Sequence, residues 1–138
     1  MPNRPNFSGV WHADFKRSQL EIQSPQSTVI KKEHDDPQFI LTRTHSANGA
    51  NDTFQVKLTT DGQEHIYFMG DMEVHSNCVW DDDSLVFKSR LHRAGFDAEN
   101  VVRYTLEQEG TEIIADEVYS GAPKSYHNKW VLIKEEVI

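Results

Sequence analysis

Two side chains in this sequence have types and neighbours suited to acid/base chemistry, and the first is His34. It lies in the stretch EHDDP (33–37), after a strand-like run and before two aspartates. Carboxylates raise the pKa of a nearby imidazole, so His34 is a candidate general base or ligand anchor at the mouth of the fold. We favour the alternative, in which His34 is a turn residue whose ring bonds to local backbone.

Glu117 is the second candidate for acid/base chemistry. In the run 111–120 alternate residues share a face, and Glu117 shares its face with Ala115 and Tyr119. If that face points inward, an apolar interior raises the pKa of the carboxyl group, which then suits proton transfer or ligand binding. Two other arrangements remain open, and we favour them together over a role of Glu117 in chemistry or binding. A bulge after Ala115 turns Glu117 outward, or Glu117 pairs internally with Arg43 or Lys129.

Small polar side chains on the same predicted interior suggest a binding pocket. Ser76, Cys78 and Ser89 leave room for a ligand and offer it hydrogen bonds, although a filled core uses the same side chains beside large neighbours. No G-x-S-x-G surrounds either serine, which argues against a nucleophile. Cys78 has no basic neighbour in the sequence and is also typical of a small buried apolar residue. The predicted ligand-binding set is Tyr67, Ser76, Cys78, Phe87, Ser89, Tyr104 and Glu117.

The histidines and glycines do not form a metal or nucleotide motif. None of the seven histidines belongs to an H-x-H, an H-x-x-x-H or a Cys/His cluster. The glycine-rich loops that cradle phosphates are missing from the sequence as well. We therefore expect no metal and no cofactor.

Length and charge limit the class of protein. A chain of 138 residues fits one domain, here 1–138, and its single cysteine cannot form an internal disulfide. A net charge of -8 with scattered Lys and Arg argues against nucleic-acid binding. No apolar run approaches a membrane span of about 20 residues. The N-terminal sequence lacks a signal peptide, which predicts a cytoplasmic protein, or a periplasmic or secreted one if a signal has been removed.

The elements that must position these residues are strands. Runs with period-2 character recur along the chain, separated by short turn signals such as Asp61-Gly62 and Glu109-Gly110. Because short turns join antiparallel neighbours and no helix covers the sheet, closure is the economical solution. The sequence predicts an all-β, antiparallel up-and-down barrel of 8–10 strands. The ten predicted runs are 7–15, 27–34, 38–46, 53–60, 64–69, 72–80, 84–92, 100–108, 111–120 and 125–135.

Four short motifs in order carry a resemblance to a known family. The stretches FSGVW (7–11), EHDDP (33–37), VWDDDSLVF (79–87) and VLIKE (131–135) resemble those of small bacterial lipocalin-like proteins of the calycin superfamily. The resemblance implies that Trp11 plugs the closed end of the barrel, beside Gly9, and that a basic residue packs on it. Candidates for that residue are Arg43, Arg103 and Lys129. The segment 16–26 is too short for the paired helices of fatty-acid-binding proteins, and no R-x-Y lies near the C-terminus, which argues against a fatty-acid role.

The leading functional hypothesis is that a small, mostly hydrophobic molecule binds in the barrel lumen. The polar contacts would come from His34, Ser76, Ser89, Tyr104 and Glu117. One alternative is a barrel enzyme with acid/base chemistry, an isomerase, cyclase or lyase, that uses His34 or Glu117 as its base. Another is a filled barrel that acts through its surface, as a monomer or a homodimer. The residues favour a binding protein over an enzyme without excluding either.

Overall fold

The fold is all-β, and each of its ten strands corresponds to one of the ten predicted runs. The structure is a computed structural model that describes residues 5–121 and 124–136. The strands are β1 (Gly9–Ala13), β2 (Ser27–Asp35), β3 (Gln38–Ala47), β4 (Ala50–Thr59), β5 (His65–Met69), β6 (Met72–Asp81), β7 (Ser84–Arg93), β8 (Phe96–Glu107), β9 (Glu112–Gly121) and β10 (Tyr126–Lys134). One short 3-10 turn, η1 (Gln108–Gly110), joins β8 to β9.

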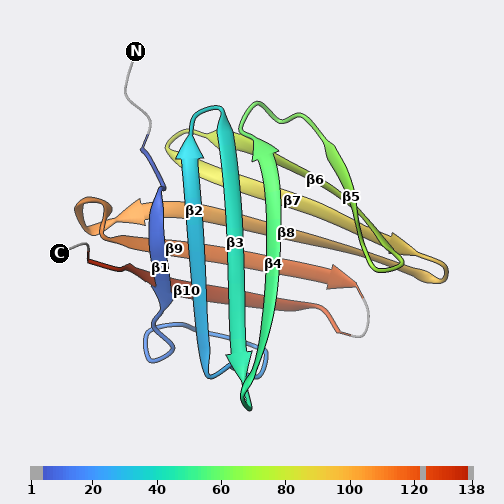
Figure 1. Cartoon of the computed structure of the whole chain (residues 1–138), viewed down its shortest axis with the longest axis horizontal. Coiled ribbons are helices and arrows are strands. Elements are labelled where there is room, and N and C mark those ends of the chain that lie inside the picture. The colour runs from blue at the N-terminus through green and yellow to red at the C-terminus, as the bar shows by residue number, and fades with distance from the viewer. Residues whose placement is uncertain (1–4, 122–123, 137–138) are drawn as a thin grey trace.

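All ten strands pair antiparallel in one sheet that curls into a nearly closed barrel. Their order is β4-β3-β2-β1-β10-β9-β8-β7-β6-β5, so the first strand joins the last. In Figure 1, β1 to β4 lie in front and cross the strands behind them at a steep angle. The sheet ends at β4 and β5, and there the rings of Phe54 and Tyr67 lie 6.0 Å apart between their centroids. We call this gap in the pairing the β4–β5 seam.

Turn chemistry explains why consecutive strands fold back on each other. Between β3 and β4, Asn48 and Gly49 have φ values of 53° and 77°. Two consecutive positive φ values match the right-handed twist of a hairpin, and Asn-Gly is the pair that adopts them most readily. The sequence ANGAND (47–52) therefore sets the register of this hairpin, in which Ala47 opposes Ala50.

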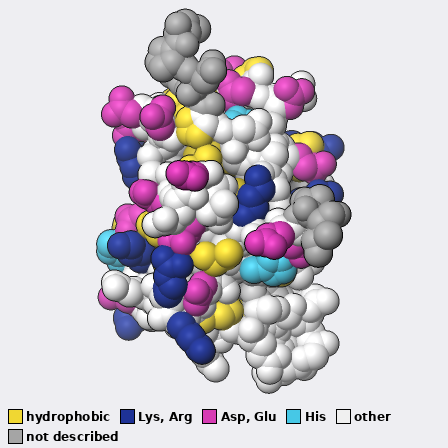
Figure 2. Space-filling model, turned by 90° about the vertical axis from the view of Figure 1, so that its left-hand side faces the viewer, with side chains coloured by type: hydrophobic (Ala, Val, Ile, Leu, Met, Phe, Trp, Pro, Cys, Tyr) yellow, Lys and Arg dark blue, Asp and Glu magenta, His cyan; other side chains and the backbone are white. Residues whose placement is uncertain are grey.

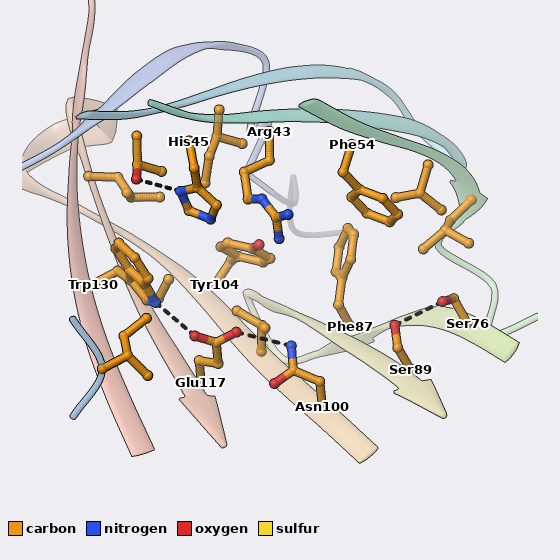
Figure 3. Close-up of a pocket in the computed structure, with 18 of the residues that line it drawn as sticks. Arg43, His45, Phe54, Ser76, Phe87, Ser89, Asn100, Tyr104, Glu117 and Trp130 are labelled. Carbon is orange, nitrogen blue, oxygen red and sulfur yellow. Dashed lines mark hydrogen bonds between the residues drawn. The ribbon is translucent and has the colours of Figure 1, made fainter. Parts of the chain in front are cut away.

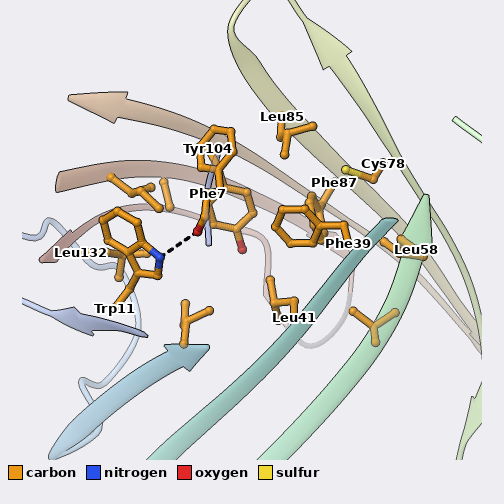
Figure 4. Close-up of a cluster of buried hydrophobic side chains, with 14 of the residues drawn as sticks. Phe7, Trp11, Phe39, Leu41, Leu58, Cys78, Leu85, Phe87, Tyr104 and Leu132 are labelled. Atoms are coloured by element: carbon orange, nitrogen blue, oxygen red, sulfur yellow. Dashed lines mark hydrogen bonds between the residues drawn. The ribbon is translucent and has the colours of Figure 1, made fainter. Parts of the chain in front are cut away.

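The hydrophobic core contains Trp11 and extends from it to the cavity described below. Trp11 is fully buried, and its indole N–H donates a 3.0 Å hydrogen bond to the carbonyl of Phe7 (Figure 4). Gly9 has a φ of 141°, and a Cβ there would lie 2.9 Å from Cε of Lys134. The positive φ makes glycine the residue suited to this position beside Trp11, whereas the flexible side chain of Lys134 can move away from an added Cβ.

The basic residue on Trp11 is Lys134, which corrects our sequence interpretation. Its Nζ lies 5.7 Å from the centre of the indole ring. None of the three candidates occupies this place: Arg103 pairs with Asp81 on the outside at 2.6 Å, Lys129 is exposed, and Arg43 points into the lumen (Figure 3). Lys134 follows the apolar stretch of β10. Because β1 pairs with β10, Lys134 lies directly opposite Trp11.

The segment between β1 and β2 lies along β10 and packs against the core. Backbone bonds between Gln19 and Lys129 hold it along β10. The amide of Glu21 donates a 2.8 Å hydrogen bond to the side chain of Asn128, and Leu20 and Ile22 pack against the core. This segment contains no helix.

The outer surface carries charges of both signs. On the face seen in Figure 2, Lys and Arg side chains lie among Asp and Glu side chains. Positive charge is therefore not gathered into one patch on this face. In the described part of the chain, no helix is long and apolar enough to cross a membrane.

Candidate functional site

A cavity of about 180 Å³ lies inside the barrel, toward the end where β2 begins and β3 finishes. The strands deliver alternate residues to it, so its lining follows directly from the period-2 pattern. The residues that line it are Ile22, Thr28, Ile30, Arg43, His45, Phe54, Val56, Leu58, Tyr67, Ser76, Phe87, Ser89, Asn100, Val102, Tyr104, Ala115, Glu117, Tyr126, Trp130 and Leu132.

Six of the seven residues predicted to bind a ligand line this cavity: Tyr67, Ser76, Phe87, Ser89, Tyr104 and Glu117. Three of them form a hydrogen-bonded chain of hydroxyl groups along β5, β6 and β7. Tyr67 Oη lies 3.1 Å from Ser76 Oγ, which lies 2.8 Å from Ser89 Oγ. The hydroxyls of these three residues thus satisfy one another within this part of the wall.

Cys78 is the exception, and its placement corrects the prediction. It is fully buried and packs in the core, outside the lining of the cavity. Burial raises the pKa of its thiol to about 12. Cys78 therefore acts as a small apolar residue, the alternative that the sequence left open.

Glu117 points into the barrel, where three N–H donors hold its carboxylate. Its Oε1 accepts hydrogen bonds from Asn128 Nδ2 at 3.0 Å and from Trp130 Nε1 at 2.9 Å. Its Oε2 accepts one from Asn100 Nδ2 at 3.0 Å (Figure 3). Both alternatives for Glu117 are therefore wrong: β9 carries no bulge that turns it outward, and its partners are amides and an indole instead of Arg43 or Lys129.

Arg43 also points into the cavity, from β3, and carries its cationic end (Figure 3). Its Cζ lies 5.4 Å from the centre of the Phe54 ring. Its Nη2 lies 3.7 Å from the exposed carboxylate of Asp52 at the rim. Its Nε is buried and has no hydrogen-bond partner among the residues that the structure describes. One N–H of Arg43 is thus available inside the barrel.

His45 lines the cavity between Thr28 and Trp130. Its Nδ1 lies 2.7 Å from Thr28 Oγ1, and its ring stacks on Trp130 with centroids 6.0 Å apart. Burial, and then the charge of Arg43, lower the pKa of the imidazole. The neutral ring is therefore favoured near pH 7, and His45 adds a flat wall to the cavity.

His34 lies at the other end of β2, away from the cavity, so its predicted position at the mouth is wrong. Its side chain is 1% exposed. Phe7 N–H donates to Nδ1 at 3.1 Å, which makes Nε2 the protonated nitrogen, and Nε2 donates to Asp36 at 2.9 Å. Because both ring nitrogens are engaged, His34 fastens the N-terminal segment to β2. The geometry leaves it no lone pair for a substrate.

Lys32 carries a buried amine that our sequence interpretation missed. Its side chain is 1% exposed, and its Nζ lies 3.1 Å from the centre of the Tyr104 ring. Nζ has no hydrogen-bond partner within 5–121 and 124–136. Burial lowers the pKa of this amine well below its usual value. Lys32 faces inward with Ile30 and His34, so it lies beneath the floor of the cavity.

The same part of the chain offers no cluster of three or more His, Cys, Asp or Glu side chains that could hold a metal ion. Both carboxylate oxygens of Glu117 accept hydrogen bonds from N–H groups. Both ring nitrogens of His34 are also engaged, Nδ1 as an acceptor and Nε2 as a donor. The arrangement in the lumen is thus suited to holding a molecule by shape and by a few directed hydrogen bonds.

A nearly closed barrel of ten antiparallel strands around an internal cavity defines a calycin, lipocalin-like fold, and solved structures share it. Secretory abundant heat soluble protein 4 from Ramazzottius varieornatus is similar over 99% of this chain and 100% of its own, with a TM-score of 0.67 and 13% identity. A second such protein from this organism, from a dimer sample, is similar over 94% of this chain and 95% of its own, with a TM-score of 0.62 and 14% identity.

Human cRBP IV, a cellular retinol-binding protein, has the same fold. It is similar over 95% of this chain and 99% of its own, with a TM-score of 0.58 and 12% identity. No protein-family model and no curated protein sequence matches the chain. The comparisons establish the fold that the four motifs implied, whereas a bacterial origin stays a prediction.

The predicted ligand-binding set omitted fourteen of the twenty residues that line the cavity, including the polar or aromatic side chains of Arg43, His45, Asn100 and Trp130. A signal for two of them was present. Phe39 and Leu41 begin an apolar face in the run 38–46, and the same alternation continues to Arg43 and His45. Charged and polar residues are mostly exposed in proteins. That expectation outweighed the two-residue alternation, which places Arg43 and His45 on the inner face.

Proposed function

We propose that this protein binds a small, mostly apolar molecule in the lumen of its barrel. The observation that carries the proposal is the internal cavity of about 180 Å³, whose wall combines aromatic rings with a few polar groups. Natural ligand sites have this character, with apolar walls and a small number of placed hydrogen-bonding groups. The neighbouring solved structures support the fold for such a role.

The size of the cavity limits the occupant. Pockets for drug-sized ligands measure about 300–1,000 Å³. A protein cavity of about 150 Å³ accommodates benzene. At about 180 Å³, the lumen suits a molecule of one ring with short substituents.

Binding is tested by thermal unfolding with a compact probe, toluene, and with a matched pair of variants. A probe that binds only the folded state raises the stability by about 2.7 kcal/mol at a hundredfold excess over Kd. Ala115→Leu adds volume to the cavity wall and should abolish the shift. Val118→Leu, on the outer face of the same strand, should retain it. A melting temperature that toluene leaves unchanged, or a shift that survives Ala115→Leu, would overturn the proposal.

A second candidate function is action through the surface, as a homodimer. Edge strand β5 exposes Ile66 at 57% and Phe68 at 66%. An apolar edge strand is a template for pairing with another chain. Sedimentation of the protein across concentrations tests this, with Phe68→Asp as the disrupting variant. A monomer at every concentration would remove the candidate.

A cytoplasmic location remains a prediction from the sequence.

A further inference from the structure

We propose that the ligand is a compact aromatic acid with a hydrogen-bond donor at the end opposite its acid group. Its acid group would bind Arg43, and its donor would bind Asn100. This inference rests on the proposed lumen binding and narrows it to one chemical class.

The first step is the unused donor of Arg43. Its Nε is buried and lacks a partner in the part of the chain described, while Nη2 turns to Asp52 at the rim. A buried guanidinium N–H without an acceptor is costly, and a charge-assisted bond to an acid group is the strongest way to satisfy it. The ring of Phe54, 5.4 Å from Cζ, holds the guanidinium in place from one side.

The second step is the unused acceptor of Asn100. Its Nδ2 donates to the carboxylate of Glu117 at 3.0 Å, so the amide cannot be flipped without placing two oxygens together. That constraint assigns Oδ1 as the free atom. Oδ1 is buried and has no donor among residues 5–121 and 124–136. An occupant therefore completes the site by donating a hydrogen bond, as a phenol or an indole N–H does.

The third step is the orientation. Arg43 and Glu117 place opposite charges in one small cavity (Figure 3). The carboxylate of Glu117 repels a second acid group, whereas the guanidinium attracts it. A ligand with an acid at one end and a donor at the other therefore has one favourable direction in the lumen.

The fourth step is the shape between these two ends. Six aromatic rings line the cavity, and the His45 imidazole adds a seventh planar group. Aromatic pairs gain about 0.5–1.5 kcal/mol beyond the area they bury. With a volume of about 180 Å³, the cavity favours one planar ring over a long aliphatic chain. The lining rings are Phe54, Tyr67, Phe87, Tyr104, Tyr126 and Trp130.

Titration calorimetry with four probes tests the assignment without any variant. The probes are 4-hydroxyphenylacetate, its isosteric amide 4-hydroxyphenylacetamide, phenylacetate and palmitate. We expect the hydroxy acid to bind at least about tenfold more tightly than the amide, because a hydrogen bond to a charged group contributes about 1.5–3 kcal/mol. It should also bind more tightly than phenylacetate, which lacks the donor, and more tightly than palmitate.

Two variants then separate the two ends of the ligand. Arg43→Met should weaken 4-hydroxyphenylacetate by about ten- to a hundredfold while changing 4-hydroxyphenylacetamide less than about threefold. Asn100→Ala should weaken 4-hydroxyphenylacetate by about two- to tenfold relative to phenylacetate. Arg90→Met is the matched control, because Arg90 is exposed on the outside of the barrel and pairs with Glu64. It should leave all affinities unchanged.

The outcomes distinguish this inference from the proposed function. Binding of toluene or palmitate with no preference for the acid over its amide would overturn the assignment and leave lumen binding in place. Failure of every probe, toluene included, would overturn both. Equal losses for acid and amide in Arg43→Met would show a packing role for Arg43 and would also contradict the assignment.

Discussion

The amine of Lys32 lies 3.1 Å from the centre of the Tyr104 ring, with both residues buried in the core. Aromatic faces attract cations, but the environment of Lys32 is too poor in hydrogen-bond acceptors to replace water. Burial therefore lowers the pKa of the amine well below its usual value, and between the folded and the unfolded pKa the folded protein holds less of a proton at Lys32 than the unfolded chain does.

The first prediction concerns stability against pH. Unfolding takes up a proton at Lys32, so the free energy of unfolding rises with pH, by up to about 1.4 kcal/mol per pH unit from this group. Lys32→Met should raise stability near pH 7 and flatten that slope. Urea unfolding between about pH 7 and about pH 8 stays above the ordinary pKa of an imidazole, about 6.5, and below that of the thiol in the unfolded chain, about 8.5. A variant that is less stable and keeps the slope would contradict this view of Lys32.

The second prediction assigns His34 to stability. His34→Ala leaves the Phe7 N–H and the Asp36 carboxylate each without one partner, and should cost about 1–3 kcal/mol. The shift in melting temperature caused by toluene should stay as in the parent protein. His12→Ala, at an exposed ion pair with Glu135, should change stability by less than about 0.5 kcal/mol. Loss of the toluene shift in His34→Ala would instead connect His34 to the lumen.

The third prediction separates the contribution of Trp11 to stability from that of the Lys134 charge that lies over its ring. Trp11→Ala removes a fully buried indole and should cost about 3–5 kcal/mol, measured by denaturant unfolding. Lys134→Met keeps the packing and removes only the charge 5.7 Å from the ring, so it should cost about 1 kcal/mol or less. Similar losses for the two variants would mean that the charge, and not the plug, stabilises this end of the barrel.

The fourth prediction concerns the carboxylate of Glu117. Glu117→Gln replaces one acceptor oxygen with an NH2 group that faces the N–H donors of Asn100, Asn128 or Trp130. At least one buried donor then loses its acceptor, at a cost of about 1–3 kcal/mol. Asp116→Asn, the same change on the exposed neighbour, should cost less than about 0.5 kcal/mol. A stable Glu117→Gln would show that the three donors do not depend on the charge.

The strand pattern could be predicted well because two local signals agree along most of the chain. In β6 and β7 the alternation that places Ser76 and Ser89 on one face is the same alternation that the barrel requires. Turn residues such as Asn48 and Gly49 reinforce it. Cross-strand pairing adds nothing that contradicts these signals, so each run became a strand.

The polar parts of the interior could not be predicted in the same way. Lys32 and Arg43 lie on inward faces of β2 and β3, but their types are common on surfaces, and only the closed barrel shows that they are enclosed. The partners of Glu117 come from β8 and β10, and the sequence alone does not specify the register between them. The pairing of strands distant in sequence therefore determines which polar groups meet in the lumen. The alternation along each strand determines only which residues face the lumen.

The β4–β5 seam determines where the barrel wall can open at the lowest cost. Everywhere else around the wall, widening the barrel means breaking a ladder of backbone hydrogen bonds. At the seam no ladder joins β4 to β5, and the rings of Phe54 and Tyr67, which both belong to the cavity wall, lie side by side. Parting two rings exchanges dispersion contacts for water and breaks no ladder between strands, because β4 and β5 do not pair. Amide hydrogen exchange should therefore remain slow in the inner strands while molecules enter and leave through this side.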